Sequence, residues 1–456
     1  MNLKDIIADI VRIIDNQDFS CKKVTFDTIT TRSKIQISYT SDVRYKIELF
    51  KDIIKINLEP PLSNISDSSL YDICRNTICD FYTERTLHEG IENNSRDHIK
   101  KLKKEIKERV HMSLTTLTHH FPAHTCLFPF SETISIGPVT FYPNLQWVKK
   151  LELHDNYVQR ASILASNEDL INWKEELIKL TNPLERHESD NYVANHIYGI
   201  LKESNTILEI EIDNFEPDLS RKLAKIVTQA TIDSFSLIFN NEGMFKQQNL
   251  YERPTLPVSF NTLVSYRGKF VYPIMTLTER IQAYNGDAIS ALLHENKKFI
   301  DAVGSIINSV INKNEHPNKD LSIRWTTSLN WYAEAQREQD DAIALAKIGI
   351  SLDVLSGGGE WVGILEMVKN ILGFDDQYVI FEKPHKTVLK EFISDLYNNG
   401  RSQIVHGNHI DRLMPFEQQR KKASKMCRVI LMESAHNLIN YSGDGSHNAF
   451  VKMAHR

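Results

Sequence analysis

Residues 388–407 read VLKEFISDLYNNGRSQIVHG, and this segment decides how we interpret the last third of the chain. Its apolar residues recur at the spacing of an amphipathic helix with one buried face. Gly400 then interrupts that helix. Arg401 and His406 lie five positions apart, so an uninterrupted helix of 3.6 residues per turn would point them in different directions. A helix end or a turn at this place would bring the two side chains together.

An arginine and a histidine at such a turn suit the cleavage of a phosphodiester. The guanidinium stays charged and fits phosphate oxygens, and the imidazole exchanges protons near neutral pH. In RNA the 2′-hydroxyl can itself be the nucleophile, so the protein only needs to move protons and to stabilise the charge that develops on phosphorus. No metal is required. For an arbitrary pair at this spacing, the alternative is that Arg401 forms a structural ion pair and His406 caps a helix.

The sequence LYNNGRSQIVHG at residues 396–407 resembles the Arg-x4-6-His signature of HEPN (higher eukaryotes and prokaryotes nucleotide-binding) domains, in particular their Apea-like branch. The stretches 329–335 and 350–355 also resemble the first helices of that branch. Many members of the family are metal-independent endoribonucleases that act as toxins or in defence against phage. The resemblance implies that Arg401 and His406 are the catalytic pair.

The resemblance also implies partners. In the family, two protomers bring their motifs together across a helical interface, so we expect a homodimer through the C-terminal helices. A phage-derived trigger or an antitoxin is a further expected partner. Ser402, which stands where active members often have Asn, Asp or His, and Asn408 would hydrogen-bond the phosphate. Because position 408 is not tyrosine, the tyrosine nucleotidylation that silences some toxins of this family is not expected.

RNA binding requires a local basic patch, because the formal net charge of −5 argues against a protein covered in positive potential. Residues 411–428 contain six cations and two anions. On the helix predicted there, Lys421, Lys425 and Arg428 share one face and form a basic ridge. The expected RNA contacts of this region are Arg412, Lys421, Lys422 and Lys425.

The composition places limits on the class of protein. With 456 residues, 41% of them hydrophobic and 25% charged, the chain has the content of a soluble protein of several domains. Its first fifteen residues form a charged helical pattern unlike a signal peptide, and no apolar run approaches the ~18 residues of a membrane span. The five scattered cysteines indicate reduced thiols rather than a zinc site. We expect a cytoplasmic protein without a membrane partner, metal or cofactor.

The predicted fold class is α+β. Residues 1–142 form an α+β domain, in which helices are expected at 3–15 and 68–85, a hairpin at 133–143, and antiparallel strands at 34–39, 45–49 and 54–58. Residues 143–312 form a mostly helical middle domain with a strand pair at 263–272. The polar segment 312–320 is the preferred boundary. Residues 321–442 form an all-α HEPN-like bundle, and residues 443–456 form a C-terminal tail.

Several motifs have two interpretations. The carboxylates of Glu209, Glu211 and Asp213 could bind a metal, although strands with one solvent face have the same pattern. Gly357-Gly358-Gly359 is interpreted as an interhelix turn rather than a phosphate loop. His406 and His409 lack further metal ligands at convincing spacing. Asp353 and Glu366 could each orient Arg401 or His406, or be solvated. The lysines of residues 98–109 form either a solvated helix face or an RNA contact.

Three functions follow. The first is a metal-independent endoribonuclease. The second is a non-catalytic RNA-binding or nucleotide-binding module that keeps the fold without the chemistry. The third is a protein-interaction scaffold in which the C-terminal helices serve only for dimerisation.

Overall fold

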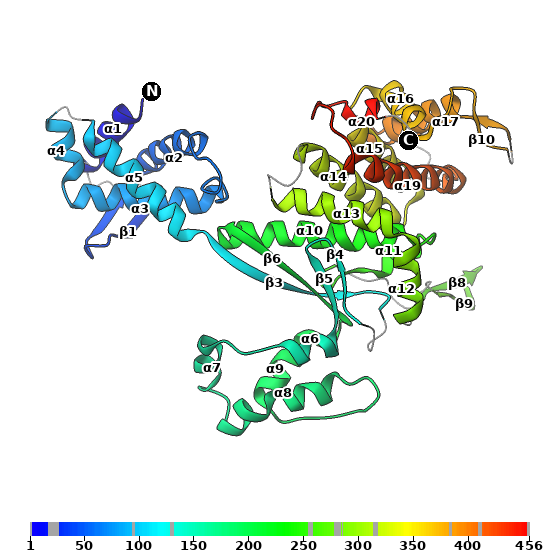
Figure 1. Cartoon of the computed structure of the whole chain (residues 1–456), viewed down its shortest axis with the longest axis horizontal. Helices are drawn as coiled ribbons and strands as arrows, with labels where there is room; N and C mark the ends of the chain where they lie inside the picture. Colours follow the sequence, from blue (N-terminus) through cyan, green and yellow to red (C-terminus); the bar gives the residue numbers. More distant parts are fainter. Residues whose placement is uncertain are drawn as a thin grey trace. The chain divides into compact units, whose positions relative to one another are not determined.

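The computed structural model describes residues 2–16, 27–93, 96–127, 132–253, 259–277, 284, 286–312, 318–382, 385–408 and 413–453. The chain divides into two units, Met1–Thr118 with Glu211–Ala224, and His119–Ile210 with Lys225–Arg456. Both units combine helices with short antiparallel pairings, which confirms the predicted α+β class (Figure 1). The elements that pass from one unit into the other are β3 (Thr115–His124), β6 (Thr206–Phe215) and α10 (Pro217–Leu237).

The first unit is a group of helices with one small sheet. Its elements are α1 (Leu3–Asp15), β1 (Asp27–Thr30), β2 (Gln36–Tyr39), α2 (Ser41–Ile56), α3 (Asp67–Thr83), α4 (Thr86–Glu92) and α5 (Asp97–Ser113). Strands β1 and β2 pair antiparallel. The helices predicted at 3–15 and 68–85 and the strand predicted at 34–39 are confirmed.

The strands predicted at 45–49 and 54–58 are wrong, because residues 45–49 and 54–56 lie in α2 and residues 57 and 58 follow its end. Their alternation of apolar and polar residues imitates a strand. A helical set with spacings of four, three and four residues is buried instead, and it consists of Val43, Ile47, Phe50 and Ile54. Tyr45 and Ile56, which a strand would bury, are 62% and 84% exposed.

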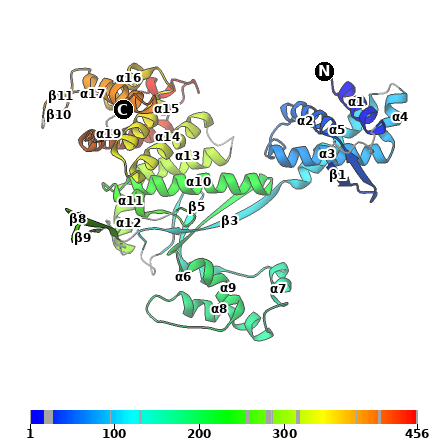
Figure 2. The same cartoon turned by 180° about the vertical axis from the view of Figure 1, so that it is seen from behind.

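The second unit contains a mixed region around a five-stranded sheet. Strands β4 (Ile134–Ile136), β5 (Val139–Pro143) and β7 (Asn249–Leu250) join β6 and β3 in the order β4-β5-β6-β3-β7. Gly137, with φ of +57°, makes the turn of the hairpin predicted at 133–143. Between β5 and β6 the chain forms four helices with their own apolar core (Figure 2), and these are α6 (Asn144–Lys150), α7 (Asp155–Ala161), α8 (Asn167–Thr181) and α9 (Tyr192–Leu201).

The rest of the second unit is largely helical. Its helices are α11 (Gly243–Gln247), α12 (Gly286–Glu295), α13 (Lys297–Ile311), α14 (Lys319–Arg337), α15 (Asp341–Ser356), α16 (Glu360–Leu372), α17 (Leu389–Asp395), α19 (Glu417–Ile439) and α20 (Ala449–Lys452). Helix α19 contacts α13, α14, α15 and α16. The fully buried Trp325 joins α14 to α19, since its Nε1 donates to the carbonyl of Leu431 at 2.9 Å. The expected boundary at 312–320 lies between α13 and α14, which contact each other.

One detail of the predicted all-α region differs from the expectation, and another agrees with it. The short strands β10 (Val379–Phe381) and β11 (Thr387–Val388) pair antiparallel, so the region is not purely helical. Gly357, Gly358 and Gly359 all have positive φ and connect α15 to α16, which confirms the interhelix turn.

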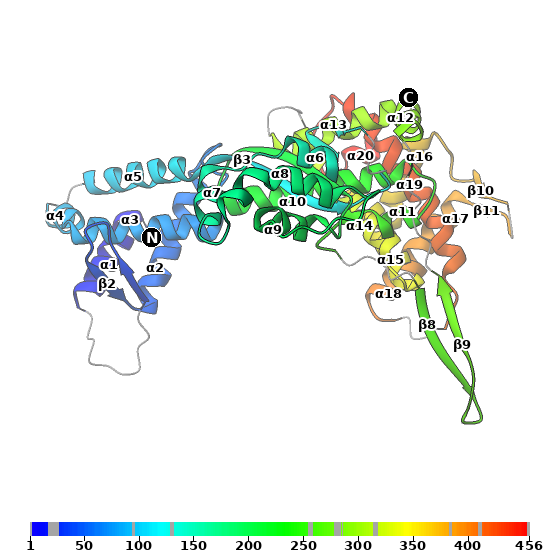
Figure 3. The same cartoon turned by 90° about the horizontal axis from the view of Figure 1, so that it is seen from below.

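The strand pair predicted at 263–272 is a longer hairpin, formed by β8 (Ser259–Tyr266) and β9 (Lys269–Leu277). It extends away from the neighbouring helices of its unit (Figure 3). Among the described residues, no single helix has both the length and the apolar content of a membrane span, and only the bent pair α15 and α16 reaches that measure when taken together.

Candidate functional site

The predicted turn around Arg401 is a change of helix type followed by a helix end. Helix α17 continues into a π-helical segment, η1 (Leu396–Ser402), and then into the short helix α18 (Gln403–Val405). π-Helical turns are rare and recur at functional sites. The helix ends at His406, after which Gly407 has φ of +69°. The N–H of Asn408 donates to the carbonyl of Gln403 at 2.8 Å, which is the closing bond of a glycine-capped helix end.

Arg401 is held by two side chains. Its Nη2 lies 2.8 Å from the carboxylate of Asp353 on α15, and its Nη1 donates to the hydroxyl of Tyr397 at 3.0 Å. The guanidinium also lies 4.9 Å from the centre of the Tyr397 ring. Its Nε is buried and has no partner among the described residues. Because a guanidinium has five N–H groups, these two contacts leave N–H groups available for a phosphate.

Helix α15 approaches Arg401 closely, and a glycine allows this. A Cβ placed on Gly349 would lie 2.8 Å from the Cβ of Arg401. Asp353 follows Gly349 by one helical turn, so the glycine and the carboxylate lie on the same face of α15. Gly400 makes a similar approach, since a Cβ there would lie 3.1 Å from the side chain of Leu345. The small residues let the backbone of η1 lie against α15.

Asp353 is the carboxylate that meets Arg401, one of the two candidates from the sequence. Burial raises the pKa of Asp353 above its ordinary value, the charge of Arg401 acts in the opposite direction, and Glu360 adds to the rise. The side chains of Asp353 and Arg401 are 18% and 22% exposed, so the ion pair is partly shielded from water. Glu366, the other candidate, instead pairs with Lys369 at 2.9 Å.

His406 is exposed at the end of the same helix. Within the described part of the chain, no hydrogen bond to its imidazole is found, and none joins it to Arg401. Ser402 is half-buried, and its carbonyl accepts the N–H of His406 at 3.0 Å. Asn408 is exposed. His409 and Arg412 lie outside the described residues.

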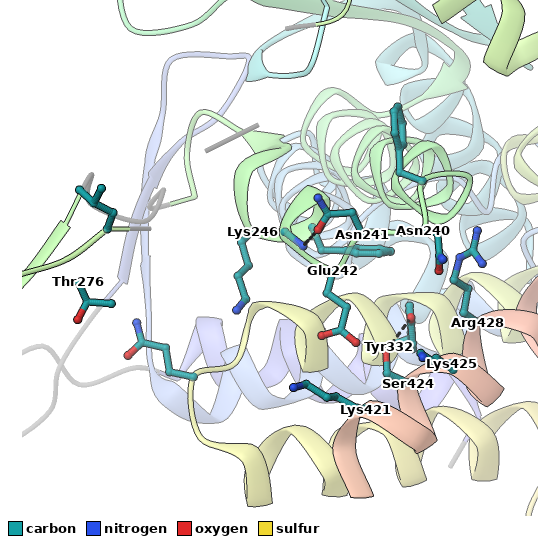
Figure 4. A pocket seen from close by; sticks show the side chains of 15 residues that line it. Asn240, Asn241, Glu242, Lys246, Thr276, Tyr332, Lys421, Ser424, Lys425 and Arg428 are labelled. Atoms are coloured by element: carbon teal, nitrogen blue, oxygen red, sulfur yellow. Dashed lines mark hydrogen bonds between the residues drawn. The ribbon is translucent and has the colours of Figure 1, made fainter. Parts of the chain in front are cut away.

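The basic residues of α19 separate into three environments. Arg420 is buried, and it pairs with Asp341 at 2.9 Å and donates to the carbonyls of Ala335 and Glu338, so it holds helices together. The Nζ of Lys422 lies 4.8 Å from the centre of the Phe381 ring. The predicted ridge residues Lys421, Lys425 and Arg428 line a cavity of about 680 Å³ (Figure 4).

Two of the three carboxylates considered for a metal, Glu209 and Asp213, have other partners. Glu209 lies 2.5 Å from the Nζ of Lys150 and 3.5 Å from His120. Asp213 accepts the hydroxyl of Thr116 at 2.5 Å. Throughout the described ranges, no group of three or more His, Cys, Asp or Glu side chains is placed to hold a metal ion.

Sequence reasoning missed two supports of Arg401. Tyr397 precedes Arg401 by four residues, a spacing at which helical side chains meet, but the sequence indicated only an apolar stripe and the motif for it, not a contact with Arg401. Gly349 is the second support. It stands in a helix interior one turn before a carboxylate, and this spacing was the sequence signal that could have indicated a close helix contact there.

Comparisons with protein-family models, with curated proteins and with solved structures found no match to the chain. The resemblance to HEPN domains therefore stays a prediction based on the motif.

Proposed function

We propose that the chain is a metal-independent endoribonuclease that acts as a toxin or as an effector of defence against phage. The observation that supports this proposal is the arrangement of Arg401, fixed by Asp353 and Tyr397 on a π-helical turn, with the exposed His406 at the end of the same helix. A fixed guanidinium and an accessible imidazole are the groups that cleavage through the 2′-hydroxyl requires.

In the proposed reaction, His406 removes the proton of the 2′-hydroxyl as the 2′-oxygen attacks phosphorus. The bond between phosphorus and the 5′-oxygen breaks, and the 5′-oxygen leaves with a proton as a hydroxyl. The remaining N–H groups of Arg401 stabilise the charge on the phosphorane oxygens, and Ser402 and Asn408 hydrogen-bond the phosphate. The products are a 2′,3′-cyclic phosphate and a 5′-hydroxyl.

The site has one arginine and one histidine per chain. In a homodimer through the C-terminal helices, a second copy would bring its own pair to the same cleft, so that one imidazole accepts a proton while the other donates one. The protein would act in the cytoplasm, and its remaining domains would sense a trigger or bind an antitoxin.

A non-catalytic RNA-binding, nucleotide-binding or dimerisation module is the second candidate. The observation that favours it is that Arg401 already has an ion pair and a hydrogen bond, while within the described residues no hydrogen bond joins Arg401 to His406. In that case Asp353 and Arg401 would serve only to join α15 to η1.

The experiment is RNA cleavage by the purified full chain with a chelator present. We expect the parent to cut RNA and the variants Arg401→Ala and His406→Ala to lose at least about a hundredfold in rate, the usual contribution of a general acid or base. His111→Ala, which removes an exposed histidine of α5, is the matched control and should cut as the parent does. If Arg401→Ala and His406→Ala cut as well as the parent, the proposed site is wrong. RNA binding without cleavage by the parent would favour the second candidate.

A further inference from the structure

The cavity beside α19 has a strongly basic lining. Its walls come from the segment 239–246, from the end of β9, from Tyr332 of α14 and the nearby Gln339, and from α19 (Figure 4). Among the described residues that line it, four are cations, Lys246, Lys421, Lys425 and Arg428, and one is an acid, Glu242. Like charges gathered in a concave surface concentrate positive potential there, so the cavity attracts anions.

These cations are only partly neutralised by the protein. Lys421 pairs with Glu417 at 2.5 Å. Neither Lys246 nor Lys425 forms an ion pair with a carboxylate in the described part of the chain. The Nε of Arg428 donates to the carbonyl of Leu237 at 2.7 Å, which fixes the guanidinium while its terminal nitrogens have no described carboxylate partner. The cavity therefore offers a ligand one guanidinium fixed by a hydrogen bond and two ammonium groups without a described carboxylate partner.

We propose that this cavity binds a nucleotide with two or more phosphates. Phosphate groups fit a guanidinium and ammonium groups that converge on one space. The volume of about 680 Å³ lies within the range of small-molecule sites. Glu242 is the acceptor suited to ribose hydroxyls. The amide of Asn240 supplies a donor and an acceptor for a base, and Asn241, whose Oδ1 accepts the N–H of Gly243 at 2.8 Å, supplies a donor.

A small ligand fits the lining better than a long RNA strand. A strand needs cations that continue along its path. Lys422, which follows Lys421 on α19, lies over the ring of Phe381 and does not line the cavity. The positive charge is thus concentrated in one place rather than extended along the helix.

The nucleotide would hold α11 and α19 together, because Lys246 belongs to α11 and the other cations belong to α19. Binding to the folded state alone raises the temperature of unfolding. This inference does not depend on the proposed nuclease activity, because neither Arg401 nor His406 lines the cavity.

The test is calorimetric titration of the full chain with ATP at low ionic strength. We expect saturable binding of one ATP per chain, together with a higher unfolding temperature. Lys246→Glu and Lys425→Glu should each weaken binding at least about tenfold, because each replaces attraction to the phosphates by repulsion. Lys425→Gln should weaken it less. Lys422→Glu makes the same charge change on the same helix outside the cavity, and should bind ATP as the parent does.

Absence of saturable binding by the parent would overturn the proposal. So would an equal loss in Lys422→Glu, because the effect would then be one of net charge. The last measurement is competition between ATP and a short single-stranded RNA. If that RNA displaces ATP, and if Lys422→Glu weakens RNA binding as much as Lys425→Glu does, the cavity is part of an RNA path and the nucleotide site is wrong. Circular dichroism confirms that each variant is folded.

Discussion

The guanidinium of Arg401 lies 2.8 Å from the carboxylate of Asp353 and thereby joins the π-helical segment η1 to the last turn of α15. The two residues belong to helices separated by α16 and the β10–β11 pair in the sequence. The contact fixes the guanidinium of Arg401, one of the two groups that the proposed reaction uses, in a defined place. It also makes the position of Arg401 dependent on the protonation of Asp353.

Replacing Asp353 by Asn should remove a pH dependence of stability. Since burial raises the pKa of Asp353, the folded chain binds its proton more tightly than the unfolded chain does. The stability that the protonated group contributes is therefore complete below the ordinary carboxyl pKa, and it is lost as the pH rises through the raised pKa. Urea unfolding of the parent and of Asp353→Asn between about pH 3 and pH 7 measures the difference. A parent that gains stability over the variant as pH rises would mean that Arg401 outweighs burial.

Gly349→Ala should displace Arg401. The added methyl would lie 2.8 Å from the Cβ of Arg401, so the two helices must move apart. We expect a loss of about 1–3 kcal/mol in the free energy of unfolding, as for other overpacked sites, together with slower RNA cleavage. Gly199→Ala is the matched control, since a Cβ on that residue of α9 meets no atom within 4 Å. Gly199→Ala should leave cleavage unchanged and raise the free energy of unfolding by up to about 1 kcal/mol. Equal stability and activity of the two variants would contradict the close approach.

Asp233→Ala should be strongly destabilising. Asp233 of α10 is fully buried, forms an ion pair with Arg337 of α14 and accepts the amide of Gln229 at 2.9 Å. Removing the carboxylate leaves Arg337 buried with Glu334 as its remaining carboxylate, at 3.1 Å. We expect a loss of about 3–5 kcal/mol in the free energy of unfolding, measured in urea.

A surface pair supplies the control for Asp233. Lys225 and Glu252 form an ion pair in which both side chains are 46% exposed. Glu252→Ala should therefore change stability by no more than about 1 kcal/mol. If the two alanine variants lose the same stability, burial does not control the strength of the Asp233 pair.

Local sequence patterns predicted the elements whose apolar spacing is unambiguous. Helix α1 is an example, because its buried face includes Ile6, Ile10 and Ile14 at spacings of four residues, with Ile7 and Val11 beside them. Helix α2 is the counterexample. Its residues alternate as in a strand and also recur as in a helix, and only packing in the core of the first unit decided between the two patterns.

The environment of Arg401 could be predicted only in part. The sequence identified Asp353 as a candidate because α15 carries a carboxylate on a predicted helix. It could not distinguish Asp353 of α15 from Glu366 of α16, since the choice depends on which of the two helices brings its carboxylate to η1. The cavity at Lys425 could not be predicted either, because Lys246 belongs to a helix that is distant in the sequence. Contacts between elements remote in sequence carry this information.

The chemistry of the cut ends tests the central claim most directly. The parent is incubated with RNA in the presence of a chelator, and the termini of the products are identified by mass spectrometry. If Arg401 and His406 promote attack by the 2′-hydroxyl, the products carry a 2′,3′-cyclic phosphate and a 5′-hydroxyl, and an RNA with a 2′-deoxy residue at the cleavage position stays intact. Products with a 5′-phosphate and a 3′-hydroxyl, or cleavage of the 2′-deoxy substrate, would contradict the mechanism.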